Sequence, residues 1–274
     1  MHHYIKRIKL IDRILTDKPI RLFVILAGIF IGNALVAEFL GVKIFSLEAT
    51  FGFEPFDWTI FGVEGLGLNL SAGVLLWPIV FVMTDVINEY FGMRSVRFLS
   101  HLAIGIIFYS FIMIYGAIWL TPNEWWQSIS GINEAMPEKS ITNMNVAFQK
   151  IMGQGLWIII GSMVAFLVGQ IVDVWVFHGI KKRTGEKKVW LRATGSTLVS
   201  QFIDSFIVLF IAFYIGADWD LIRVIAIGMV NYSYKFIMAV LLTPAIYLAH
   251  YIIDNYVGEE TAHQMKEEAA LSVG

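Results

Sequence analysis

Long apolar segments alternate with shorter polar ones along most of the chain. A helix needs about 20 mostly apolar residues to cross the hydrocarbon core of a bilayer, and six segments approach that length. We expect membrane-spanning helices near residues 21–41, 71–92, 97–120, 155–179, 194–215 and 223–253. The pattern therefore predicts an all-α membrane protein with six transmembrane helices.

The two ends of the chain follow a different pattern. In residues 1–20, Lys and Arg alternate with Ile and Leu, which is typical of an amphipathic helix lying on a membrane surface. A cleavable signal peptide would instead have a compact basic end, an apolar core and small residues at its cleavage site. We expect an amphipathic segment at 1–20, a transmembrane domain at 21–253 and a polar tail at 254–274.

Basic residues are divided unevenly between the two sides of these spans. Most of the 20 Lys and Arg residues precede the first span or follow the second, fourth and sixth spans, all on one side of the membrane. Cytoplasmic loops carry such an excess of positive charge. The distribution predicts that both termini are cytoplasmic, which is consistent with an even number of spans.

Two loops on the opposite side, at 42–70 and 121–150, are rich in aromatic residues. Aromatic side chains of this kind favour the membrane interface. The loops therefore either anchor the chain at the interface or cap a binding cavity.

Small residues recur at intervals of four in the first and fourth spans. This spacing lets two helices approach closely. The residues are Gly28 and Gly32 in the first span, and Gly161, Ala165 and Gly169 in the fourth. Such contacts form within one chain or between chains, so a homo-oligomer stays open.

Composition narrows the class of protein further. The chain is 57% hydrophobic and 15% charged, whereas soluble domains carry about a quarter charged residues. The net charge of −2 argues against a nucleic-acid partner. The chain has no cysteine, no HExxH, no GxSxG and no glycine-rich phosphate loop. We expect no enzymatic activity, no metal or cofactor, and no ATPase within the chain.

Ionisable and amide side chains occur inside four of the six spans, at similar depth. Such groups are costly in a bilayer and by default indicate a functional site. Neighbours three or four positions apart share a helix face, so each stripe faces one way. The residues are Asp85, Gln170 with Asp173, Gln201 with Asp204 and Ser205, and Asn231 with Lys235. We expect them to line one small polar cavity.

A purely structural interpretation of these charges is also open. Lys235 can pair with Asp204 or with Asp173 and neutralise a buried charge. Three acids near one cation leave an excess of negative charge, however. At least one acid must then be protonated, hydrated or in contact with a ligand.

Four motifs follow one another in order along the last five spans. They are Trp77-Pro78 with TDVINEYFG at 84–92, GQIVDVWVFHGIKK at 169–182, TGSTLVSQFIDSFIVLFIAF at 194–213 and NYSYKFIMAVLLTP at 231–244. Together they resemble the queuosine precursor transporter family, also called the vitamin-uptake-transporter-like family, over about residues 70–253. The loop at 121–150 is longer than the family pattern, which leaves substrate choice within the family open.

The resemblance implies a fold, a location and a class of substrate. It implies a six-helix fold similar to the substrate-binding components of energy-coupling-factor transporters, in a bacterial plasma membrane. The implied substrates are 7-deazaguanine precursors of the tRNA nucleoside queuosine, in their 7-cyano and 7-aminomethyl forms, carried without an ATPase module. The motif positions that the resemblance carries over are Asp85, Gln170, Asp173, Ser200, Asp204 and Lys235.

The chemistry of a deazaguanine suits these side chains. A carboxylate can accept two adjacent N–H bonds from the pyrimidine edge, a role for Asp204 or Asp173. A cation or amide can donate to the carbonyl, and aromatic rings can stack on the base plane. Candidates are Lys235, Gln170 or Asn231 for the carbonyl, and Trp77, Phe81 or Phe202 for stacking. Proton coupling and facilitated diffusion both fit the sequence.

Three other functions stay in consideration. The nearest is a binding component for another vitamin or nucleobase that depends on an energising partner module. A membrane-embedded enzyme acting on a lipid or quinone lacks a nucleophile-and-base pair or a metal set in the sequence. A structural scaffold does not explain polar stripes on four spans.

Overall fold

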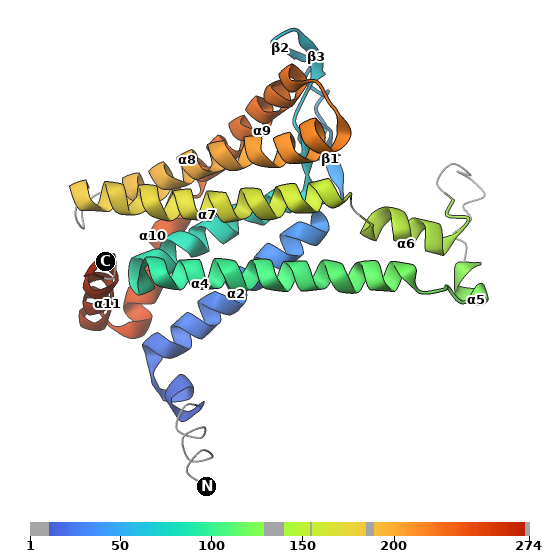
Figure 1. Cartoon of the computed structure of the whole chain (residues 1–274). Helices are drawn as coiled ribbons and strands as arrows, with labels where there is room; N and C mark the ends of the chain where they lie inside the picture. Colours follow the sequence, from blue (N-terminus) through green and yellow to red (C-terminus); the bar gives the residue numbers. More distant parts are fainter. Residues whose placement is uncertain (1–10, 129–139, 154, 185–188, 272–274) are drawn as a thin grey trace.

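A bundle of long helices forms the body of the protein (Figure 1). The computed structural model describes residues 11–128, 140–153, 155–184 and 189–271. Within these residues, five helices are long and apolar enough to cross a membrane. They are Lys18–Leu40, Trp77–Trp119, the helix Leu156–Thr184 within the stretch Met144–Thr184, Thr194–Ile215 and Leu221–Leu241. These helices confirm the prediction of an all-α membrane protein. Most of the amphipathic segment predicted at 1–20 lies outside the described residues.

Helix α4, Trp77–Trp119, is bent into two arms. Its 43 residues would extend about 65 Å if straight, roughly twice the hydrocarbon thickness of a bilayer. Gly92 has φ 78° and ψ 170°, a conformation essentially restricted to glycine. Figure 1 shows that the chain reverses direction at this bend. The two arms correspond to the segments at 71–92 and 97–120 that the sequence treated as separate spans.

Helices α7, Leu156–Thr184, and α8, Val189–Leu209, run side by side and share the largest helix interface of the bundle (Figure 1). A Cβ at Gly161 would lie 3.0 Å from the carbonyl oxygen of Val208. The small residues of the fourth span therefore pack within the chain. A Cβ at Gly28 or Gly32 of α2, Lys18–Leu40, would meet nothing within 4 Å. After α8, the chain continues as a π-helix, Phe210–Ile215.

The segment predicted as one span at 223–253 contains a helix long enough to cross a membrane, Leu221–Leu241, but it is not one continuous helix. Helix α9, Leu221–Leu241, ends at Leu242, and helix α10, Thr243–Val257, begins there with Pro244 in its first turn. Proline lacks the N–H that would continue the hydrogen bonds of α9. A further helix, α11, spans Glu259–Leu271 and packs on α4.

Short strands structure the first aromatic loop, which the sequence did not predict. Strand β1, Ile44–Ser46, pairs antiparallel with β4, Asn69–Ser71, and β2, Trp58–Ile60, pairs antiparallel with β3, Val63–Leu66. A short helix, α3 (Leu47–Thr50), and a 3-10 turn, Ala72–Leu75, complete the loop. The second aromatic loop contains α5, Glu124–Gln127, and α6, Met144–Met152, and its residues 129–139 lie outside the described part of the chain.

The first loop is held by a hydrogen bond within it and by apolar packing against α9. The buried carboxylate of Glu48 accepts a hydrogen bond from the backbone N–H of Leu68 at 2.6 Å. Leu66 packs against Ala226 and Val230 of α9. Leu70 and Val74 pack against Tyr234 one turn further along α9. The loop therefore packs against α9 along two successive turns.

The bend at Gly92 yields a stability prediction. Gly92→Ala forces a Cβ into a backbone conformation that costs about 1–3 kcal/mol, so we expect a lower free energy of unfolding in detergent. Gly105→Ala is the matched control in the same helix, because a Cβ there meets nothing within 4 Å. Thermal unfolding of both variants measures the difference. Equal stability of the two variants would contradict the assigned role of Gly92.

Candidate functional site

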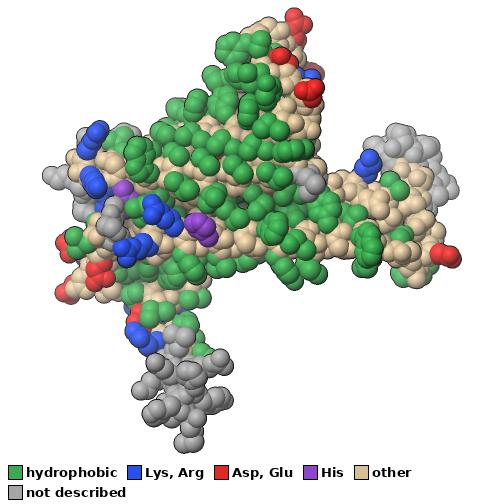
Figure 2. Space-filling model, in the orientation of Figure 1, with side chains coloured by type: hydrophobic (Ala, Val, Ile, Leu, Met, Phe, Trp, Pro, Cys, Tyr) green, Lys and Arg blue, Asp and Glu red, His purple; other side chains and the backbone are tan. Residues whose placement is uncertain are grey.

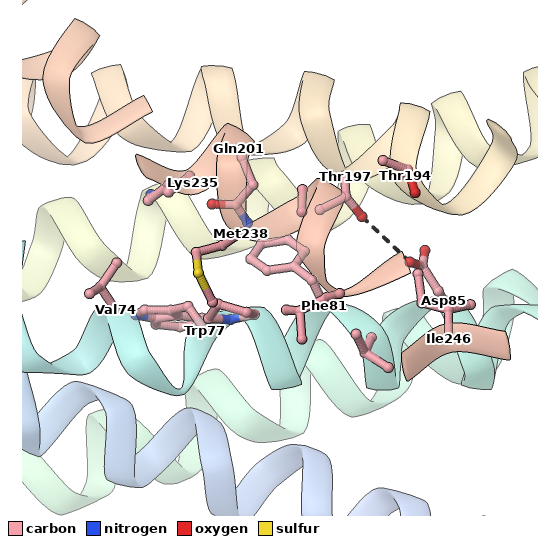
Figure 3. Close-up of a pocket in the computed structure, with 14 residues that line it drawn as sticks. Val74, Trp77, Phe81, Asp85, Thr194, Thr197, Gln201, Lys235, Met238 and Ile246 are labelled. Carbon is pink, nitrogen blue, oxygen red and sulfur yellow. Dashed lines mark hydrogen bonds between the residues drawn. The ribbon is translucent and has the colours of Figure 1, made fainter. Parts of the chain in front are cut away.

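A cavity with about 440 Å³ of empty space lies between the first arm of α4, the helices α8 and α9, and the start of α10 (Figure 3). That space includes open solvent, and water-sized spheres fit in only about 30 Å³ of it, so a larger ligand requires the lining side chains to move apart. The break between α9 and α10 contributes Leu242 and Ile246 to the wall. Val74, just before α4, also lines the cavity and links it to the first aromatic loop.

One wall of the cavity is aromatic and apolar. Trp77 and Phe81 are one turn apart on α4, with their ring centroids 6.5 Å apart. Trp77 also packs on Phe166 of α7, with ring centroids 5.2 Å apart, which holds its indole in place. Met238 of α9 faces the same space. This wall offers a surface for the flat face of a ring.

The opposite wall carries hydroxyl, amide and charged groups. Thr194, Thr197 and Gln201 line the cavity from α8, at positions three and four apart that share one helix face. Asp85 approaches from α4, and the hydroxyl of Thr197 donates to its Oδ2 at 3.4 Å (Figure 3). Both Asp85 and Gln201 are buried from solvent. The polar groups of α8 therefore lie across the cavity from the aromatic rings of α4, and Asp85 lies on the same helix as those rings.

Lys235 of α9 lines the cavity and forms an ion pair with Asp204 of α8. The structure thus decides between the two acids that the sequence offered as partners, and Asp173 is not the partner. The pair is partly shielded, with side-chain exposures of 14% for Lys235 and 19% for Asp204. It joins α8 to α9 beside the cavity.

Gln170 and Asp173 of α7 lie outside the residues that line the cavity, contrary to the expectation of one shared lining. Thr84 of α4 donates to the Oε1 of Gln170 at 3.1 Å. Ser200 of α8 donates to the Oδ1 of Asp173 at 3.2 Å. The stripe on α7 therefore faces the hydroxyl groups of its neighbouring helices, and the charged part of the expected cavity is smaller than predicted.

The remaining two candidates also lie outside the cavity lining. The Ser205 hydroxyl donates to the carbonyl of Gln201 within its own helix, at 2.7 Å. Asn231 is half-buried on α9, one turn before Lys235. Of all the candidates that the sequence offered, the structure brings together Trp77, Phe81, Asp85, Gln201 and Lys235 around the cavity.

Sequence reasoning missed two polar groups of the lining, Thr194 and Thr197. Their spacing with Gln201 along α8 was the available signal. Threonine is tolerated in membrane helices because its hydroxyl can bond to its own helix backbone. A row of threonines therefore does not by itself indicate a binding site. Within the described residues, there is no group of three or more His, Asp or Glu side chains that could hold a metal ion.

Comparison with known proteins adds an independent line of evidence. The family model described as "Putative vitamin uptake transporter" matches residues 71–249. The chain is 28% identical over 197 residues to a probable queuosine precursor transporter of Bacillus subtilis, covering 70% of this chain and 77% of the relative. It is 24% identical over 179 residues to the queuosine precursor transporter of Escherichia coli, covering 65% and 71%. No solved structure matches the chain.

The pair of Lys235 and Asp204 yields a prediction about stability. Lys235→Met leaves a shielded carboxylate without its cation, so we expect the free energy of unfolding to fall by about 2 kcal/mol. Combining it with Asp204→Asn removes the uncompensated charge and restores most of that loss. Thermal unfolding in detergent measures the three variants.

A matched control for the loss of a lysine charge is Lys182→Met at the exposed end of α7, which we expect to leave stability unchanged. A double variant no more stable than Lys235→Met alone would show that the ion pair does not account for the effect.

Proposed function

This chain belongs to the putative vitamin uptake transporter family, and we propose that it is a carrier that imports 7-deazaguanine precursors of queuosine. Its relatives in Bacillus subtilis and Escherichia coli bear the names of queuosine precursor transporters. The observation that carries the proposal is the cavity, which pairs an aromatic wall with a polar wall. That pairing matches a planar base with a hydrogen-bonding edge.

Each wall has a role in this proposal. The base plane stacks against Trp77 and Phe81, as bases do on aromatic side chains. The Asp85 carboxylate accepts the adjacent N–H groups of the pyrimidine edge. Lys235 or Gln201 donates to the base carbonyl. We assign the acceptor role to Asp85 because Asp204 is engaged by Lys235 and Asp173 lies outside the cavity lining.

The proposed topology has six crossings with both termini in the cytoplasm. The bend at Gly92 supports it by dividing α4 into two arms. The distribution of positive charge supports this topology as well, because the last turn of α7 contains Lys181, Lys182 and Arg183. In Figure 2, Lys and Arg gather at that end of the bundle, where α11 also lies, while apolar side chains cover much of its flank. That end would face the cytoplasm, in a bacterial plasma membrane.

The proposal also specifies a stand-alone carrier that uses no ATPase module. The alternative is a binding component that borrows an energising partner. The two differ in what purification would recover, since the alternative requires an ATPase to copurify from the native membrane. Transport by the purified chain alone in proteoliposomes supports the carrier.

A queuosine assay on tRNA tests the substrate class. Cells that cannot make the precursor but express this chain are supplied with 7-cyano-7-deazaguanine or 7-aminomethyl-7-deazaguanine, and queuosine in their tRNA is measured. We expect queuosine from at least one precursor at external concentrations too low to support cells without the gene. Absence of queuosine from both, with the protein present in the membrane, would refute the proposal.

Substitutions in the cavity test the assigned roles by direct binding. Asp85→Asn removes the charge from the proposed hydrogen bonds, so we expect deazaguanine affinity to fall about ten-fold or more. Trp77→Ala removes a stacking surface and should also weaken binding by about ten-fold. The control for the tryptophan is Trp175→Ala, on an α7 side chain that is 75% exposed. Wild-type affinity in both cavity variants would show that the ligand binds elsewhere.

A further inference from the structure

Polar and ionisable groups follow α7 from one end to the other, and most have partners on neighbouring helices. Positions 162 to 181 extend about 28 Å along the helix axis, close to the hydrocarbon thickness of about 30 Å. In order, the contacts are Ser162 with Glu38, Gly169 beside Asp204, Gln170 with Thr84, Asp173 with Ser200, His178 with Asn88, and Lys181 with Glu89. The series places ionisable groups across most of the membrane depth.

Two acids of this series, Glu89 and Asp204, are paired with a lysine, and Asp173 is not. Glu89 lies 3.2 Å from the ammonium group of Lys181, and Asp204 is paired with Lys235. Asp173 is fully buried, and no cation pairs with it among the residues that the structure describes. On α8, the hydroxyl groups of Ser196, Thr197 and Ser200 lie beside its carboxyl.

The other charged groups near Asp173 are already engaged. From α4, Asp85 approaches through the Thr197 hydroxyl, which adds a second acid rather than a cation. On α7 itself, the His178 ring bonds to Asn88 at 2.9 Å. From α9, Lys235 is held by Asp204. An ionised carboxylate buried without a cation is strongly unfavourable, so Asp173 holds a proton in this conformation.

The geometry shows where a proton can be taken up and how it relates to the substrate. The Oδ1 of Asp173 accepts from Ser200, while Oδ2 is buried without a hydrogen-bond partner among the described residues. Oδ2 is therefore the oxygen open to a proton. Thr197 lines the cavity, donates to Asp85 and lies beside Asp173. One hydroxyl thus connects the cavity to the buried acid.

We propose that Asp173 binds and releases one proton in each transport cycle, so that the substrate and a proton cross the membrane together. This inference rests on the proposed carrier function. The carboxyl takes its proton from the outer compartment before substrate binds, holds it while the substrate crosses, and gives that proton to the cytoplasm when the cavity opens there and water reaches it. It returns to its starting state, so one proton crosses with each substrate molecule.

Purified protein in proteoliposomes separates coupling from binding. Labelled 7-cyano-7-deazaguanine is measured in two assays: accumulation driven by an alkaline interior, and exchange against unlabelled substrate with no gradient. A gradient of one pH unit sustains up to a ten-fold concentration ratio when one proton moves with each substrate. We expect wild-type protein to approach this ratio and to acidify the interior as substrate enters.

Asp173→Asn imitates the protonated carboxyl and cannot release a proton. We expect it to retain exchange and to lose accumulation, so that the concentration ratio falls to about one. Asp173→Glu keeps an acid, and we expect gradient-driven accumulation to return at least in part. Glu267→Gln, an exposed acid on α11, is the control and should accumulate substrate as wild type does.

The outcomes are distinguishable. The inference would be overturned if Asp173→Asn accumulated substrate to the same concentration ratio as wild-type protein. It would also be overturned if the ratio reached by wild-type protein did not change with the pH gradient. Either result would leave the carrier function intact. Loss of both assays by Asp173→Asn in protein that elutes and unfolds as wild type does would also overturn it, because a purely structural role predicts that result. No exchange by wild-type protein would overturn the proposed function and this inference with it.

Discussion

A polar side chain inside a bilayer has to find its hydrogen-bond partner within the protein, since the hydrocarbon core offers no water. The packing of this bundle follows from that constraint. Thr84 meets Gln170 between α4 and α7, Ser200 meets Asp173 between α7 and α8, and Lys235 meets Asp204 between α8 and α9. Each contact fixes how one helix is rotated relative to the next, where apolar packing alone would allow several rotations.

The backbone irregularities of the structure lie near these polar contacts. Gly92 bends α4 just beyond Asn88 and Glu89, which bond to α7. The break before Pro244 opens the wall of the cavity between α9 and α10. Interrupted helices are tolerated at membrane depth where the freed backbone is covered by protein or lines a cavity. The same interruptions thus give the bundle its shape and its internal space.

The sequence identified the polar stripe on each helix better than it predicted the direction that each stripe faces. Asp85, Gln201 and Lys235 line the cavity as the stripes indicated, because each helix has one polar face that turns inward. The polar stripe on α7 could face either the cavity or α8. It faces the hydroxyl groups of α8, and the sequence alone does not show which of these groups lie opposite it. The short strands of the 42–70 loop escaped prediction because they have three or four residues each. The division at Pro244 was missed because both sides of it are apolar.

The hydrogen bond and the ion pair of the cavity lining affect how tightly a carrier binds its substrate and how easily it releases it. Asp85 is bonded to Thr197 and Lys235 is paired with Asp204, so a substrate must compete with partners within the protein. Displacing those bonds reduces the net gain from each new contact, since only the difference contributes to affinity. A carrier has to release what it binds, and release then re-forms the internal bonds. The polar groups of the cavity are therefore suited to transient binding, because Asp85 and Lys235 each have a partner within the protein.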